Sequence, residues 1–167
     1  MTEKLLEVRD LCVSYKAYEG QLKVLDGLNL EVRRRERVGL VGETGCGKTT
    51  TLRAIMRILP SPAGRVDSGE VIFKGRNVLQ LSPGEMQQLR GTELTSIFQN
   101  PTAALNPVFT VGQQLEEVIL HQARRKTGKN LSRREVRERA IRALREVALP
   151  DPERLLSNYP VQLSGGM

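Results

Sequence analysis

The sequence contains no tryptophan, two cysteines and one histidine, and aromatic residues make up 4% of its 167 residues. Two cysteines are too few for a disulfide framework, and together with His121 they do not form a spaced set of metal ligands. No apolar run approaches the roughly 18 residues that a membrane-spanning helix needs. The start of the chain lacks the basic and then apolar order of a signal peptide. We therefore expect a cytosolic chain without a membrane span of its own.

Acidic residues are scarce in one stretch, and this scarcity produces most of the net charge of +7. Between Arg124 and Arg145, ten lysines and arginines stand against two glutamates. Apolar residues at helical spacing, from Val136 to Val147, predict that these arginines line the solvated face of a helix. No aromatic residue is interleaved for base stacking, so we expect no direct nucleic-acid partner.

The strongest pattern in the chain is Gly-Glu-Thr-Gly-Cys-Gly-Lys-Thr at residues 42–49, which matches the phosphate-binding pattern G-x-x-x-x-G-K-[ST] in full. The glycines bring backbone N–H groups against phosphate oxygens, Lys48 reaches the β and γ phosphates, and the Thr49 hydroxyl ligates Mg²⁺. The pattern predicts a nucleoside triphosphate site with Mg²⁺ on Gly42, Glu43, Thr44, Gly45, Cys46, Gly47, Lys48, Thr49 and Thr50. The alternative is a glycine-rich turn that matches by chance.

The flanks of this loop favour the functional interpretation. Residues 38–41 are an apolar run typical of a buried strand, and apolar residues at helical spacing predict a helix over 49–59 that Pro60 ends. This order would place phosphates at the positive end of the helix. Cys46 lies at the same place, as a reactive thiol or simply as a small residue. In either case we expect its alkylation to block nucleotide binding.

The rest of the chain divides into a strand-rich half and a helical half. Alternating apolar and polar residues predict strands and a hairpin over the first 35 residues, and further strands at 70–74 and 94–98. A capping box, which indicates a helix start, begins at Ser82 before the strand at 94–98. Two more begin after that strand, at Thr110 and Ser132.

The second and third capping boxes predict helices near 111–125 and 133–148, and Asp151 with Pro152 opens a short further helix. We therefore expect a β lobe with the phosphate-loop core over 1–99 and a helical lobe over 100–167.

Four landmarks occur in a fixed order: Tyr15, the phosphate loop, Ile-Phe-Gln-Asn-Pro at 97–101 and Gln-Leu-Ser-Gly-Gly-Met at 162–167. The set resembles the nucleotide-binding subunits of ABC transporters, and within them the branch of dipeptide, oligopeptide and nickel importers. The resemblance implies an α/β fold of the P-loop NTPase type, with an incomplete parallel core sheet, an N-terminal antiparallel β lobe and a C-terminal helical lobe.

The resemblance also implies roles for individual residues. Tyr15 corresponds to the aromatic residue that stacks on adenine, although it could be an ordinary strand tyrosine beside Tyr18. Gln99 corresponds to the glutamine that contacts Mg²⁺ or the attacking water and senses the transmembrane partner; a polar strand end is the alternative. A third group corresponds to the signature motif, which contacts the γ-phosphate held by the other subunit. It consists of Ser164, Gly165 and Gly166, and an ordinary turn is the alternative.

Two parts of the family pattern are absent from the 167 residues: an apolar strand that ends in Asp-Glu, and a histidine after the signature, since His121 precedes it. We expect a chain cut short at the signature motif, of low stability alone, that binds ATP without turning it over.

The implied setting is the inner face of the cell membrane, with permease subunits and a second ATPase subunit as partners. The alternatives are a non-hydrolysing regulatory module, or a soluble ABC ATPase that acts on nucleic acid.

Overall fold

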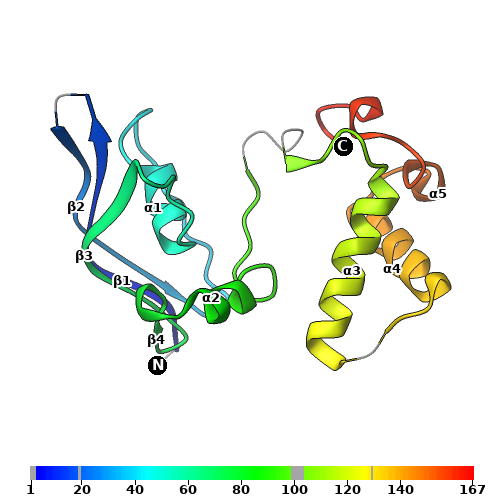
Figure 1. Cartoon of the computed structure of the whole chain (residues 1–167), viewed down its shortest axis with the longest axis horizontal. Helices are drawn as coiled ribbons and strands as arrows, with labels where there is room; N and C mark the ends of the chain where they lie inside the picture. Colours follow the sequence, from blue (N-terminus) through cyan, green and yellow to red (C-terminus); the bar gives the residue numbers. More distant parts are fainter. Residues whose placement is uncertain (1–2, 19, 99–103, 129) are drawn as a thin grey trace. The chain divides into compact units, whose positions relative to one another are not determined.

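The computed structural model describes residues 3–18, 20–98, 104–128 and 130–167. The chain forms two compact units, Met1–Thr95 and Ser96–Met167 (Figure 1). The boundary expected between residues 99 and 100 falls outside the described residues. Each unit is considered by itself below.

The first unit is built on a four-stranded antiparallel sheet with the strand order β2-β1-β3-β4. Its strands are β1 (Lys4–Ala17), β2 (Gly20–Arg33), β3 (Gly64–Phe73) and β4 (Arg76–Asn77). The predicted N-terminal hairpin is confirmed, and so is a strand through residues 70–73. β3 begins earlier than predicted because its first half pairs with the end of β1. This pairing satisfies the backbone of a segment whose composition is typical of a loop.

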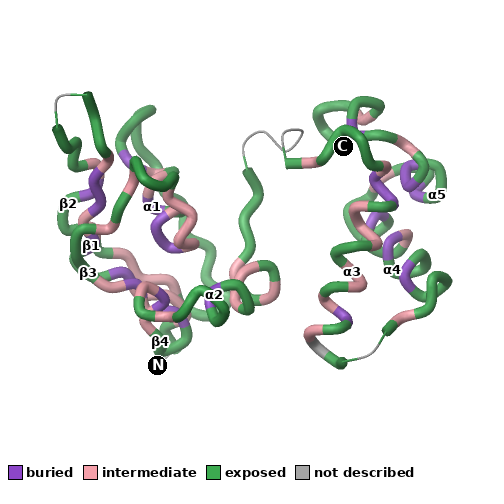
Figure 2. Tube along the Cα trace, viewed as in Figure 1, coloured by how far each residue is buried: buried purple, intermediate pink, exposed green. Residues whose placement is uncertain are grey.

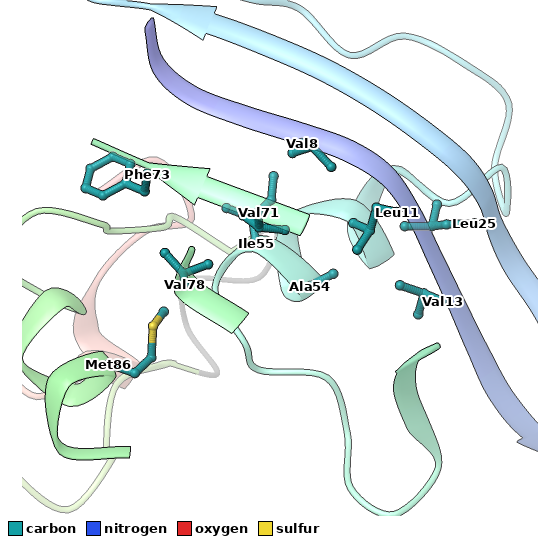
Figure 3. Close-up of a cluster of buried hydrophobic side chains, with 10 residues drawn as sticks. All are labelled: Val8, Leu11, Val13, Leu25, Ala54, Ile55, Val71, Phe73, Val78 and Met86. Carbon is teal, nitrogen blue, oxygen red and sulfur yellow. The ribbon is translucent and has the colours of Figure 1, made fainter. Parts of the chain in front are cut away.

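The core of this unit lies between the sheet and α1 (Lys48–Ile55) (Figure 3). In β1 the register shifts between Val8 and Leu11, next to Asp10 with its positive φ of 44°. An irregularity of this kind restores the inward alternation after an odd spacing, so that Val8, Leu11 and Val13 are all buried. Strand side chains and the apolar side of α1 thereby share one cluster.

The edge of this core is closed by η1 (Val78–Gln80) and α2 (Pro83–Leu89). The predicted capping box is confirmed: the Ser82 hydroxyl accepts from the backbone N–H of Glu85, and the Glu85 carboxylate accepts from that of Ser82. Met86 on α2 is 1% exposed and packs in the same cluster as Val78.

The second unit is helical. It contains α3 (Val111–Thr127), α4 (Arg133–Glu146), α5 (Pro152–Leu155) and η3 (Pro160–Gln162). The capping boxes at Thr110 and Ser132 are both present, as predicted. Buried residues appear along the inner sides of α4 and α5 (Figure 2), and they form a second core of Ala140, Leu144, Leu155 and Leu156.

Two strand predictions are wrong for this structure. Neither 38–41 nor 94–98 forms a strand, and Val41 and Ile97 expose 95% and 96% of their surface. Within the described ranges, the pairing assigned as parallel is an isolated bridge between Arg90 and Leu94. A strand needs neighbours for its N–H and C=O groups, and the antiparallel sheet recruits neither run. The parallel core sheet is therefore not formed by these residues.

Candidate nucleotide-binding site

The phosphate loop leads directly into α1, as its sequence predicts. Gly47 is the N-cap of the helix, in the left-handed region at φ 95°. A Cβ atom on Gly47 would lie 2.7 Å from Cδ2 of Leu25 and 3.3 Å from the carbonyl oxygen of Val24, both on β2. Glycine therefore allows the backbone turn and also the close contact that holds the start of α1 against the sheet.

The side chain of Lys48 folds back over the phosphate loop. Its Nζ donates to the carbonyl oxygens of Gly42 at 2.7 Å and Glu43 at 2.6 Å, and lies 3.4 Å from Sγ of Cys46. A Cβ atom on Gly42 would lie 2.6 Å from the same sulfur, so a larger residue here would displace the Cys46 side chain. The loop thus closes around a cation that is already placed over it.

The first turn of α1 suits an anion. It carries no acidic residue, and its N-cap has no side chain that could occupy the free backbone N–H groups. Such N–H groups, together with the positive end of the helix, bind phosphate. The hydroxyl of Thr51 donates inward to the carbonyl of Gly47 at 3.1 Å, whereas Thr49 is exposed. The residues at 42–50 therefore fit a phosphate group, and the Thr49 hydroxyl is free to ligate Mg²⁺.

Tyr15 lies next to this turn. Its hydroxyl is 3.5 Å from the hydroxyl of Thr50, and a Cβ atom on Gly64 would lie 2.9 Å from its ring. The ring is half-buried, while Tyr18 is fully exposed. A cavity of about 320 Å³, within the size range of small-molecule sites, is lined by Ser14, Tyr15, Lys16, Gly20, Gln21, Pro62, Ala63 and Arg65. The structure thus places Tyr15 beside the phosphate loop, and stacking on adenine stays a prediction.

The remaining predicted site residues belong to the second unit. Ser164, Gly165 and Gly166 form an exposed turn, in which the N–H of Met167 donates to the carbonyl of Ser164 at 2.9 Å. Gln99, predicted to contact Mg²⁺ or water, lies outside the described residues. The roles of these four residues stay predictions.

The sequence did not point to two arginines that hold the far end of α1. Arg57 and Arg90 donate to backbone carbonyls rather than to acidic side chains. No pairing of charges along the chain could reveal such contacts. The positive φ of Arg57, 52°, is equally invisible in its residue type.

Family comparison agrees with the phosphate loop and with the two motifs that follow it. The family model described as ABC transporter matches residues 25–167, which include the phosphate loop and both later motifs. The chain belongs to the ABC transporter family. Members of this family bind ATP, and the match spans most of both units.

Several relatives of this ABC family chain are peptide transport proteins. A probable peptide ABC transporter ATP-binding protein of Sinorhizobium fredii is 45% identical over 98% of this chain and 47% of its own length. The oligopeptide transport ATP-binding protein of Bacillus subtilis is 38% identical, over 98% of this chain and 44% of its own. The probable D,D-dipeptide transport ATP-binding protein of Escherichia coli is 39% identical, over 100% of this chain and 49% of its own length. The chain therefore spans about half the length of these relatives.

Solved ABC structures show the same fold. A dimeric bacterial ABC transporter cassette matches with a TM-score of 0.81 at 26% identity, over 97% of this chain and 64% of the other. A dimeric cassette in a post-hydrolysis state, bound to ADP and Pi, matches with a TM-score of 0.79 at 25% identity and the same coverage. The fold is thus that of a P-loop ABC ATPase. In the described part of the chain, no helix is long and apolar enough to cross a membrane.

Proposed function

We propose that this chain binds Mg²⁺-ATP as the ATP-binding part of an ABC subunit that powers peptide uptake. The observation that supports the proposal most directly is the loop that closes around Lys48 at the start of α1. A cation over the loop and free N–H groups at a helix N-terminus are complementary to a triphosphate chain.

Each residue of the site has a definite task in this proposal. Lys48 would exchange its carbonyl partners for the β and γ phosphate oxygens, and the backbone N–H groups after Gly47 would hold the same oxygens. The hydroxyl of Thr49, with Gln99, would hold Mg²⁺, which neutralises the phosphate charge. Tyr15 would offer its ring to the adenine base.

Peptide uptake is proposed because the relatives named above are peptide, oligopeptide and D,D-dipeptide transport proteins. Nothing comparable supports nickel. In this proposal the chain works at the inner face of the cell membrane, where transmembrane permease subunits carry the peptide. A second ATPase subunit would meet its signature residues Ser164, Gly165 and Gly166.

The binding step is tested by Lys48→Met, with Lys23→Met as the control, because the ammonium group of Lys23 pairs with a surface acid, Asp26. Loss of one charge-assisted contact to phosphate predicts an ATP affinity about 30-fold weaker. Titration of the unaltered chain and both variants with ATP in the presence of Mg²⁺ measures the change. Equal affinities for the two variants would contradict the proposal.

The transport step is tested in cells. A strain that lacks the subunit should lose uptake of a labelled dipeptide or oligopeptide, while uptake of the free amino acids stays normal. Restoration by the unaltered gene, and not by its Lys48→Met form, would tie peptide uptake to this site. Normal peptide uptake in the deletion strain, in the absence of a second such system, would refute the substrate class.

A further inference from the structure

The C-terminal end of α1 is held by an arginine from a distant part of the chain. Nε of Arg90 donates to the carbonyl oxygen of Met56 at 2.8 Å, and Nη2 donates to that of Arg57 at 2.6 Å. Met56 is the C-cap of the phosphate-loop helix and Arg57 is the next residue, and backbone oxygens at the C-terminus of a helix have no partner within the helix. A fork of two donors on neighbouring carbonyls fixes both distance and orientation.

A second arginine makes the reciprocal contact. Nη1 of Arg57 donates to the carbonyl oxygens of Val78 at 3.0 Å and Leu81 at 2.6 Å, at the two ends of η1. Arg57 lies two residues after the end of α1 and has a positive φ of 52°. The end of α1 and the segment from 78 to 90 are therefore joined in both directions.

The other end of α1 is fixed by close packing. Gly47 lies so near Leu25 on β2 that a Cβ atom there would be 2.7 Å from the leucine side chain. The helix itself is only eight residues long, about 12 Å at the usual rise per residue. A rod of this length transmits a shift at one end to the other. The placement of Lys48 and Thr49 therefore depends on both attachments.

We propose that Arg90 is a positioning residue for nucleotide binding: by holding Met56 and Arg57 it sets the direction in which α1 presents Lys48 and Thr49 to the phosphates. Arg90 does not touch the nucleotide. The inference rests on the proposed ATP site. It extends that site to a side chain outside the phosphate-loop pattern.

The test compares Arg90→Met with Arg90→Lys and with the control Thr92→Val. The hydroxyl of Thr92 donates to the carbonyls of Gln88 and Leu89, both in α2. ATP affinity is measured in Mg²⁺ well below each variant's melting temperature, so that only folded protein is compared. Misplacement of the phosphate contacts predicts an affinity about five- to tenfold weaker for Arg90→Met. Arg90→Lys should lie in between, and Thr92→Val should bind as the unaltered chain does.

The outcomes separate positioning from stability. If Arg90→Met lowers the melting temperature while ATP affinity stays unchanged, Arg90 is only structural and the inference is wrong. If Arg90→Met does not fold, Arg90→Lys decides the question by the same comparison. An unaltered chain that fails to bind ATP would overturn the proposed function, and this inference with it. Normal binding by the unaltered chain and by both Arg90 variants would overturn the inference alone.

Discussion

Cys46 is the one exposed thiol of the phosphate loop, with its sulfur 3.4 Å from Nζ of Lys48. A group added to this sulfur would occupy the space over the loop. We therefore predict that alkylation of Cys46 by iodoacetamide abolishes ATP binding, as measured by titration after the degree of labelling is determined by mass. The Cys46→Ser variant, which keeps Cys12, should bind ATP equally well before and after the same treatment. ATP affinity that survives full labelling of Cys46 would count against the site.

Gly47 combines a positive φ with a crowded surrounding, so its replacement should cost more than that of an ordinary glycine. In Gly47→Ala the new Cβ would press on Leu25 and on the carbonyl of Val24. Backbone strain and this contact together predict a loss of about 2 kcal/mol in unfolding free energy, with weaker ATP binding. Denaturant unfolding and ATP titration measure both effects.

Gly39→Ala is the matched control for Gly47→Ala. A Cβ atom there meets nothing within 4 Å and needs no positive φ. We expect its unfolding free energy to stay within about 0.5 kcal/mol of the unaltered chain. If Gly39→Ala proved as damaging as Gly47→Ala, the crowding at Gly47 would not be the cause.

At the scale of single residues, the sequence identified the loop because its chemistry depends on residue types at fixed spacing. Gly47 and Lys48 occupy the places that the pattern assigns to them. Arg57 and Arg90 could not be found in this way, since their acceptors are backbone carbonyls brought near by folding. Side chains that act through the backbone leave no pattern in the sequence.

The N-terminus of α4 illustrates the scale of the element. The hydroxyl and the backbone N–H of Ser132 both donate to the Glu135 carboxylate, at 2.7 and 2.8 Å. These bonds, with the charge of Arg139, hold the pKa of Glu135 below its ordinary value of 4.5. A carboxyl whose pKa is lower in the folded state stabilises the fold above its unfolded pKa. That contribution is lost as the pH falls through the folded value.

A pH dependence of α4 follows from this sign. Glu135→Gln keeps a side-chain acceptor for the capping box but removes the titration. The difference in stability between the unaltered chain and this variant should be constant above about pH 5. It should then shift in favour of the variant as the pH falls toward 3, where Glu135 becomes protonated. Denaturant unfolding followed by helical circular dichroism, at steps of pH, measures the difference. A difference that does not change with pH would refute the role of Glu135.

Helix starts were more predictable than strands because capping residues specify them locally, whereas the helix predicted over 49–59 ends at Ile55. Each capping box spans only four residues, and the three boxes that begin at Ser82, Thr110 and Ser132 are all formed. A strand depends on a partner that the local sequence does not contain. The runs at 38–41 and 94–98 have the composition of buried strands, yet find no partner in this structure. The first half of β3 shows the opposite. Its composition is typical of a loop, but it forms a strand because β1 pairs with it.

At the scale of the whole molecule, the fold family was recognisable from four motifs spread over the full chain, and the comparisons confirm it. The division into a β unit and a helical unit followed from the change of pattern along the sequence. The net charge is the property that sequence motifs leave least explained: 26 basic residues stand against 19 acidic ones. Its distribution on the helical unit makes a separate prediction possible.

The arginines of α4 lie opposite its buried side, where Val136, Ala140 and Leu144 pack into the core. An exposed basic face attracts any polyanion at low salt, but counterion release makes such binding weak at physiological salt. We predict that labelled DNA binds this chain at 20 mM salt and dissociates by 150 mM, with a Kd of about 1 μM or weaker. Fluorescence anisotropy across a salt series measures it.

The location of the charge is tested by Arg137→Glu on α4, with Arg37→Glu in the first unit as its control. Both residues are exposed, and Arg137 has basic neighbours one turn away on the same helix. Arg37 follows Glu36, and two of the arginines just before it are paired with acids, Arg33 with Glu31 and Arg34 with Glu3. Arg137→Glu should therefore weaken the binding at 20 mM salt more than Arg37→Glu does, because local charge density sets the number of counterions released. Nanomolar DNA binding that persists at 150 mM salt and is lost in Arg137→Glu would instead make this helical face a nucleic-acid site. That result would contradict the proposed role in peptide uptake and favour an ABC ATPase that acts on nucleic acid.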